Sequence, residues 1–219
     1  MIDLKEFADI LNFSDTDIYL LNVLARTKNN EEVTKKDRLL FREPVHNLSE
    51  MPHALAKMEA LAIHSGLKTY LYISANSRST IKTYKEFKIS LAKIDGQAMD
   101  NDKQYLRPLG RLDKEWYSAL MQPESRSSKY FVIDIDTKDD NTLRAVREAL
   151  MNYKIKVRRK EYKVEIKVER ETRNGYHFVT TGFDPSILEG IPNVGVSKDG
   201  LLYLGCFNFE ENNEKEKNY

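Results

Sequence analysis

An apolar segment that ends in two aspartates, residues 129–136 (KYFVIDID), constrains the fold more than any other part of the chain. Its unbroken apolar run is typical of a buried strand, and the helical spacing of apolar residues in 141–153 predicts a helix directly after it. Alternating residues in 161–170, a TRNG turn and the segment 176–181 predict an antiparallel hairpin. Residues 200–209 (GLLYLGCFNF) supply the last predicted strand, which completes the order β-α-β-β-(α)-β.

That order is the split βαβ pattern of ferredoxin-like and RNA-recognition-motif-like (RRM-like) sheets. The N-terminal half alternates helix and strand patterns, which indicates an α/β module. We therefore expect an α+β protein with an N-terminal α/β module (1–125), an RRM-like module (126–209) and a loose polar tail (210–219). In the first module we expect a helix at 4–13, a strand at 17–26, a helix capped by Ser49 and ended by Gly66, and a strand at 68–76. A further helix is expected at 78–96. It ends at Gly96 and buries Ile81, Tyr84, Phe87 and Leu91.

Charge and cysteine content exclude several classes of protein. The 35 Lys and Arg residues nearly balance the 34 Asp and Glu residues, so a net charge of +1 gives no general attraction to nucleic acid or to membranes. One cysteine, Cys206, and four histidines exclude a disulfide framework and a Cys/His zinc module. No segment has the roughly 18 consecutive apolar residues of a membrane span. We expect a cytoplasmic protein without a membrane partner, whose polyanion site is a local patch.

The two aspartates of the segment 129–136 form the first candidate site. Side chains alternate across a strand, so Asp134 and Asp136 share a face with Val132, while the odd-numbered residues pack under the helix. Neighbouring carboxylates repel one another unless a cation lies between them, and hard oxygen pairs suit Mg²⁺ or Mn²⁺. A solvated strand end that runs into an acidic turn explains the same pattern.

His177 lies on the predicted strand that follows the TRNG turn, and it can point to the same open face as the two aspartates. A single histidine on a strand is more often structural than a ligand. The preceding residues Arg173, Asn174 and Gly175 favour an anion, because a glycine-containing turn presents backbone N–H groups and arginine offers a fork to a phosphate.

A basic stretch runs through the predicted hairpin. Nine Lys and Arg residues stand against four glutamates between Lys154 and Arg173. The densest part is KVRRK, in which we expect Arg158, Arg159 and Lys160 to bind nucleic-acid phosphates. An exposed edge strand guarded by lysines explains part of the stretch equally well. Arg78 follows a predicted strand and precedes a helix, a setting that suits a template or phosphate contact, although an ordinary helix start is the commoner explanation.

Together these residues resemble three motifs of the archaeo-eukaryotic primase (primase-polymerase) superfamily in its small, phage-type form. The family's first motif, an apolar strand that ends in Asp-x-Asp, is matched by FVIDID with Asp134 and Asp136. Its second, small-x-His, is matched by Gly175 and His177. Its third, an acidic residue near a late strand, is matched by Asp199 in VSKDGLLYL. The resemblance spans roughly residues 15–208.

The resemblance implies an N-terminal α/β unit packed on an RRM-like sheet, with nucleotidyl transfer in the cleft between them. Asp134, Asp136 and Asp199 would be catalytic ligands of a two-metal site with Mg²⁺ or Mn²⁺. His177, and by position Arg173 and Gly175, would bind the incoming nucleotide. The partners would be DNA or RNA, nucleoside triphosphates and replication proteins. Two alternatives remain open: a metal-dependent nuclease, and a non-catalytic nucleic-acid or replication-associated protein that retains the fold.

Overall fold

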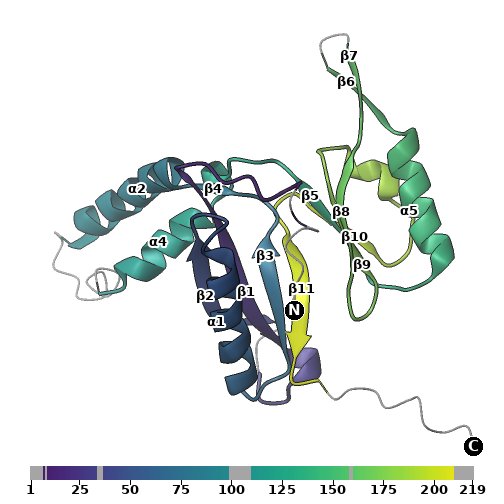
Figure 1. Cartoon of the computed structure of the whole chain (residues 1–219). Helices are drawn as coiled ribbons and strands as arrows, with labels where there is room; N and C mark the ends of the chain where they lie inside the picture. Colours follow the sequence, from purple (N-terminus) through teal and green to yellow (C-terminus); the bar gives the residue numbers. More distant parts are fainter. Residues whose placement is uncertain (1–6, 8, 34–36, 99–109, 158–159, 210–219) are drawn as a thin grey trace, which may run out of the picture.

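The computed structural model describes residues 7, 9–33, 37–98, 110–157 and 160–209. Helices and antiparallel strands form two modules that lie side by side (Figure 1). The mixed α+β class predicted from the sequence is confirmed.

The first module is built on an open antiparallel sheet with the strand order β11-β3-β1-β2, and the short β4 pairs with β1. Its strands are β1 (Asp17–Arg26), β2 (Asp37–Val45), β3 (Thr69–Ser74), β4 (Arg78–Ser79) and β11 (Leu201–Phe207). Its helices are α1 (Met51–His64), α2 (Thr80–Ala98) and α4 (Leu112–Leu120), with 3-10 turns η2 (Thr27–Asn29) and η3 (Pro123–Ser125).

The two faces of this sheet differ in what covers them. Alternate strand residues such as Leu21 and Leu71 pack in one core with Met58 of α1. On the opposite face, α4 covers only the beginning of β1, where Leu120 packs on Ile18 and Leu20. The rest of that face carries a cluster of three buried tyrosines, Tyr70, Tyr72 and Tyr203.

The second module has a four-stranded antiparallel sheet with the order β10-β5-β9-β8. Its elements are β5 (Phe131–Ile135), α5 (Asp140–Asn152), β6 (Lys154–Val157), β7 (Lys160–Lys163), β8 (Ile166–Glu171), β9 (Tyr176–Thr180), η4 (Pro185–Leu188) and β10 (Val194–Ser197). Helix α5 begins where the Asp139 carboxylate accepts a hydrogen bond from the Thr142 N–H. Its stripe of Leu143, Val146 and Leu150 packs on the odd-numbered face of β5, as the sequence predicts.

The last predicted strand belongs to the other module. Residues 200–209 were expected to complete the second sheet, but β11 pairs with β3 of the first sheet and β10 takes the expected position beside β5. Leu202 and Leu204 of β11 are buried in the core that contains α1. The predicted boundary near residue 125 is therefore wrong for this strand, because the pairing partner of a strand depends on distant residues that its own periodicity does not reveal.

Several helix predictions need correction. Helix α1 is confirmed and Gly66, with φ 67°, follows it, but Asn47 and not Ser49 accepts the Glu50 N–H. Helix α2 continues through Gly96 to Ala98. Its inward stripe is Thr83, Phe87, Ser90 and Ile94, whereas Ile81 and Tyr84 are exposed.

The strand expected at 17–26 is confirmed as β1. The helix expected at 4–13 is not confirmed: residue 7 is in a 3-10 turn, 9–10 form a turn and 11–13 have no regular structure, while 4–6 and 8 lie outside the described residues.

Candidate active site

A row of four residues crosses the second sheet on the face toward the first module. Asp134 on β5 lies opposite His177 on β9 and, on its other side, opposite Gly195 on β10. His177 in turn lies opposite Arg170 on β8. Residues directly opposite on neighbouring strands point to the same face. Val132, two residues before Asp134, belongs to the core shared with the first module, which fixes the orientation of the row.

His177 is fixed at both ring nitrogens. Its side chain is only 8% exposed, and its Nε2 lies 3.1 Å from Oδ1 of Asp134. The backbone N–H of Tyr203 donates to Nδ1 over 3.2 Å. Because Nδ1 accepts this bond, the ring proton is on Nε2 and is donated to Asp134. His177 therefore orients the Asp134 carboxylate and is itself oriented by β11 of the first module.

Asp134 is held in its ionised form. Its side chain is 45% exposed. Partial burial by itself raises the pKa of Asp134, but the hydrogen bond from His177, with the charges of Arg26 and Lys28, lowers it by more. The net result is a pKa below the ordinary value of 3.8. The carboxylate is thus available to a cation at neutral pH.

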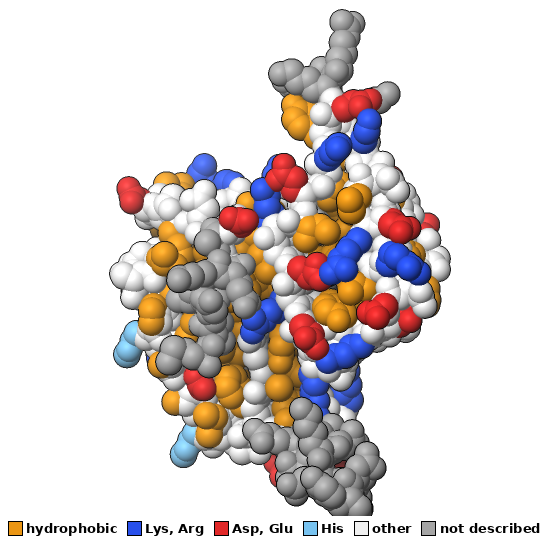
Figure 2. All heavy atoms as spheres, turned by 45° about the vertical axis from the view of Figure 1, so that its right-hand side comes forward, with side chains coloured by type: hydrophobic (Ala, Val, Ile, Leu, Met, Phe, Trp, Pro, Cys, Tyr) orange, Lys and Arg blue, Asp and Glu red, His pale blue; other side chains and the backbone are white. Residues whose placement is uncertain are grey.

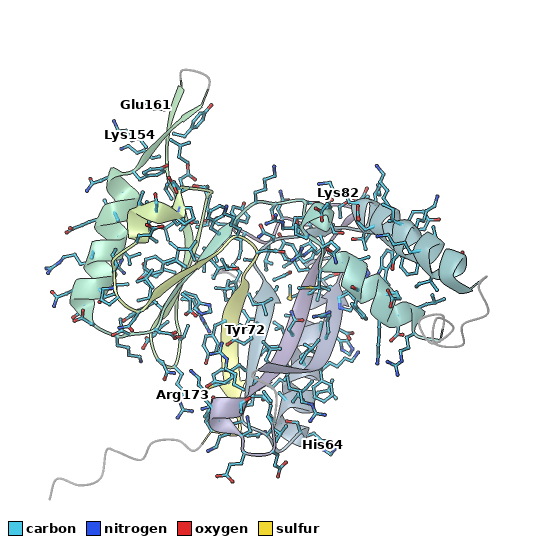
Figure 3. The ribbon with its side chains drawn as sticks, turned by 180° about the vertical axis from the view of Figure 1, so that it is seen from behind. His64, Tyr72, Lys82, Lys154, Glu161 and Arg173 are labelled. Atoms are coloured by element: carbon cyan, nitrogen blue, oxygen red, sulfur yellow. The ribbon has the colours of Figure 1, made fainter. Side chains whose placement is uncertain are left out.

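The first module supplies an aromatic and cationic wall that the sequence analysis missed. Arg26, at the end of β1, donates from Nη2 to the Tyr72 hydroxyl over 2.7 Å, and its guanidinium lies 5.1 Å from the centre of the Tyr70 ring. The Tyr72 ring stacks on the His177 imidazole with ring centres 6.4 Å apart. Tyr72 lies between the two modules in Figure 3. The alternation in KTYLYIS was the available signal, because it places Tyr70 and Tyr72 on one face.

Three adjoining cavities lie along this wall, and we name them by size and place. The small cavity, of about 20 Å³, and the large cavity, of about 500 Å³, share Arg26, Tyr72, Asp134 and His177. The edge cavity, of about 590 Å³, lies between β8 and β11 and shares Thr172, Arg173 and Tyr203 with the small one. Asp134 and His177 therefore line both the small and the large cavity.

The three predicted metal ligands are divided between two of these cavities. Asp134 and Asp136 both line the small cavity, whereas Asp199 lines the large one together with Asp134. Within the described ranges, no three Asp, Glu, His or Cys side chains are grouped closely enough to hold a metal ion by themselves. The donor set of Asp134 and Asp136 fits Mg²⁺ nevertheless, because proteins commonly bind Mg²⁺ through one or two carboxylates plus substrate phosphates.

Asp199 is paired with Arg78. The Arg78 side chain is 1% exposed, and its Nη2 lies 2.7 Å from Oδ1 of Asp199, whose side chain is 22% exposed. Arg78 also donates to the carbonyl oxygen of Gln122 over 3.4 Å. The sequence suggested an exposed contact of Arg78 with template or phosphate. Its burial corrects that prediction: Arg78 belongs to the joint between the two modules and not to a surface that nucleic acid can reach.

The turn before β9 brings Arg173 to the site but uses Gly175 structurally. Arg173 lines the small and edge cavities, with its guanidinium 4.1 Å from the centre of the Phe209 ring. A Cβ atom on Gly175 would lie 1.8 Å from the carbonyl oxygen of Ile135, so close packing explains this glycine. The Gly175 N–H donates to the Thr172 hydroxyl over 3.1 Å, so it is used within the turn and not offered to a phosphate.

The basic hairpin stands apart from the cavities. Strands β6 and β7 project from the second module (Figure 1), and Figure 3 shows Lys154 and Glu161 at the opposite end of that module from Arg173. Arg158 and Arg159 lie outside the described residues, and Lys160 is part of β7 by its backbone. On the face drawn in Figure 2, basic and acidic side chains are interspersed over the second module. The stretch from Lys154 to Arg173 is thus divided between two distant places.

Comparisons of the chain with protein-family models, with curated proteins and with solved structures find no match. Within the described ranges, no helix has the length and apolar character needed to cross a membrane.

Proposed function

We propose that this protein is a metal-dependent nucleotidyltransferase of the primase-polymerase type, which acts on a DNA or RNA primer-template with nucleoside triphosphates. One observation carries the proposal. Asp134, His177 and Asp199 come from three motifs spread over 66 positions of sequence (134 to 199, counted inclusively), and all three line the large cavity between the modules. Chance matches to three short motifs have no reason to converge on one cavity.

The topology of the second module supports the same proposal. In the order β10-β5-β9-β8, strand β9 separates β5 from β8, and α5 leads from β5 toward β8 through the projecting hairpin. This order supports the proposal that the module is a split βαβ sheet of the RRM-like kind. The site lies on the face of that sheet opposite α5, where the first module packs against it.

Each part of the site has a separate task in this proposal. Asp134 and Asp136 would hold the divalent cations, while His177 positions Asp134. A pair of divalent cations, when bound, stabilises the attacking and leaving oxygens of an in-line displacement. Arg26 and Arg173 both lie beside the two carboxylates, and Arg26 also lines the large cavity, so these two arginines bind the triphosphate. His177 is therefore assigned a positioning role, because a direct phosphate contact would require it to give up its bond to Asp134.

The nucleic-acid strand is assigned to two regions. The edge cavity adjoins the small cavity and contains Arg170 and Arg173, while Glu169 and Glu171 are paired with Arg147 and Lys138 on the neighbouring surface. The hairpin would contact phosphates farther away, through Arg158, Arg159, Lys160 and their basic neighbours. Phosphate contacts of this type would bind nucleic acid without recognising its base sequence.

Primer extension tests the proposal directly. The protein is incubated with a labelled primer-template, nucleoside triphosphates and Mn²⁺ or Mg²⁺, and we expect longer products. Asp134→Asn and Asp136→Asn should each lower the extension rate by about 100-fold or more, since loss of even an indirect metal contact costs 10–100-fold. Asp95→Asn, at an exposed position of α2, is the matched control and should leave the rate unchanged.

The products also separate the alternatives. Shorter labelled products that depend on Asp134 would indicate a nuclease and overturn the proposal. Binding of the primer-template without any change in its length, in the presence of either metal, would indicate the non-catalytic alternative.

A further inference from the structure

The large cavity has the size and chemistry of a small-molecule site. Its volume of about 500 Å³ lies within the range of roughly 300–1,000 Å³ that is usual for ligand pockets. One part of its lining is apolar, and another part carries the charged or polar side chains around Asp134. The apolar lining residues are Leu24, Val132, Val196 and Leu201; the polar ones include Arg26, Asp134, His177, Ser197 and Asp199.

Two glycines line this cavity for different reasons. A Cβ on Gly200 would lie 2.6 Å from the Cβ of Val132, so close packing requires glycine there. A Cβ on Gly195 would meet no atom within 4 Å, and the backbone of Gly195 is not in the left-handed region. Gly195 lies directly opposite Asp134 in the strand register. The fold therefore tolerates a side chain at Gly195, and the missing side chain leaves space beside Asp134.

A glycine inside a strand lowers stability and often marks the close approach of a ligand. We infer that Gly195 determines the size of the ligand in the large cavity, by leaving room for the nucleoside part of a bound triphosphate. This inference rests on the proposed function. The phosphates are assigned to the side of the large cavity that carries Arg26 and Asp134, since the small cavity, of about 20 Å³, has room for little more than a water molecule. The apolar lining of the large cavity is left for the base and the sugar.

The inference predicts opposite effects on stability and on binding. Gly195→Ala and Gly195→Val should fold with an unchanged or raised melting temperature, because β10 gains a residue with a better strand preference. Each should weaken the binding of a non-hydrolysable nucleoside triphosphate with Mn²⁺, by about tenfold for alanine and by more for valine, as expected for added bulk in a pocket. Inorganic tripolyphosphate with Mn²⁺ should bind the variants and the unmodified protein equally.

Gly96→Ala is the control. Gly96 is an exposed position of α2 that lines none of the three cavities, and a Cβ there would meet no atom within 4 Å. This variant should bind the nucleoside triphosphate normally. Unchanged triphosphate affinity in folded Gly195→Val, or an equal loss of tripolyphosphate binding, would overturn the role of Gly195 alone. Failure of the unmodified protein to bind any nucleoside triphosphate would overturn the proposed function itself.

Discussion

The interface between the two modules has a closed end and an open end, and the polar side chains at the two ends are used differently. At the closed end, Asn76 and Arg78 are buried, and the side chain of each bonds to the second module. At the open end, Asp134, Arg26 and the hydroxyl-bearing Tyr72 line cavities. The closed end joins the modules, and the open end leaves charged groups within reach of a ligand.

The two aspartates of the large cavity are therefore not equivalent. Asp199 is paired with a buried arginine, whereas Asp134 is bonded to the imidazole of His177. Substitutions at the closed end should mainly change stability. Substitutions at the open end should mainly change ligand binding.

The largest expected effect is that of Arg78→Ala. Removing one partner of a buried ion pair leaves the other without compensation, which typically costs about 3 kcal/mol of unfolding free energy. Denaturant unfolding measures this loss, and Arg144→Ala, an exposed arginine on α5, is the control and should cost less than about 0.5 kcal/mol. The double variant Arg78→Ala, Asp199→Ala should lose less than the sum of the single losses. Full additivity would show that the pair does not hold the modules together.

Asn76→Ala should have the next largest effect. The Asn76 side chain accepts from the Tyr130 N–H over 2.6 Å and donates to the Tyr130 carbonyl over 2.9 Å. Alanine would leave both backbone groups without this partner, at a cost of about 2 kcal/mol. Asn141→Ala, at an exposed position of α5, provides the comparison. If Asn76→Ala unfolds at the same denaturant concentration as the unmodified protein, the closed end is not the stabilising joint described above.

The sequence predicted those parts of the site that depend on one strand or one turn. Asp134 and Asp136 could be placed on the open face of β5, because strand alternation and the stripe of α5 are local patterns. The position of His177 beside Asp134 followed from the predicted hairpin and the split βαβ order. The role of Gly175 was misread, since the contact that requires glycine is with the distant Ile135 carbonyl.

What the sequence could not supply is the contribution of the first module. Arg26 and Tyr72 reach the site only because β11, from the end of the chain, pairs with β3 and brings the tyrosine face against the second sheet. The burial of Arg78 has the same origin. The sequence predicts that the buried stripe of α2 begins at Ile81, but the observed stripe begins at Thr83. The reason is that α4 packs on a different side of α2 from the one predicted.

The sequence predicts repulsion between the neighbouring carboxylates Asp134 and Asp136. At Asp134 this repulsion is outweighed by interactions that favour the charged form. A pKa below 3.8 means that its surroundings favour the charged form, so Asp134 stabilises the fold when ionised. This contribution is fully present above the pKa of an unfolded aspartate, and it is lost as the pH falls through the lower pKa of the folded protein. The difference in melting temperature between the unmodified protein and Asp134→Asn should therefore be constant near neutral pH and decrease in acid.

The smallest expected effect, and the one that tests the open end most directly, is a shift of the Asp134 titration in His177→Ala. Burial alone raises the pKa of Asp134, and the bond to His177 is the first of the interactions that lower it. Removing the imidazole should therefore raise this pKa, measured by carbon-13 NMR of the Asp134 carboxyl group between pH 2 and pH 7. Asp139, which is exposed and bonded to Thr142, serves as the internal reference and should titrate unchanged. An unmoved Asp134 titration in a folded variant would mean that the two side chains are not bonded in solution, and the positioning role of His177 would have to be abandoned.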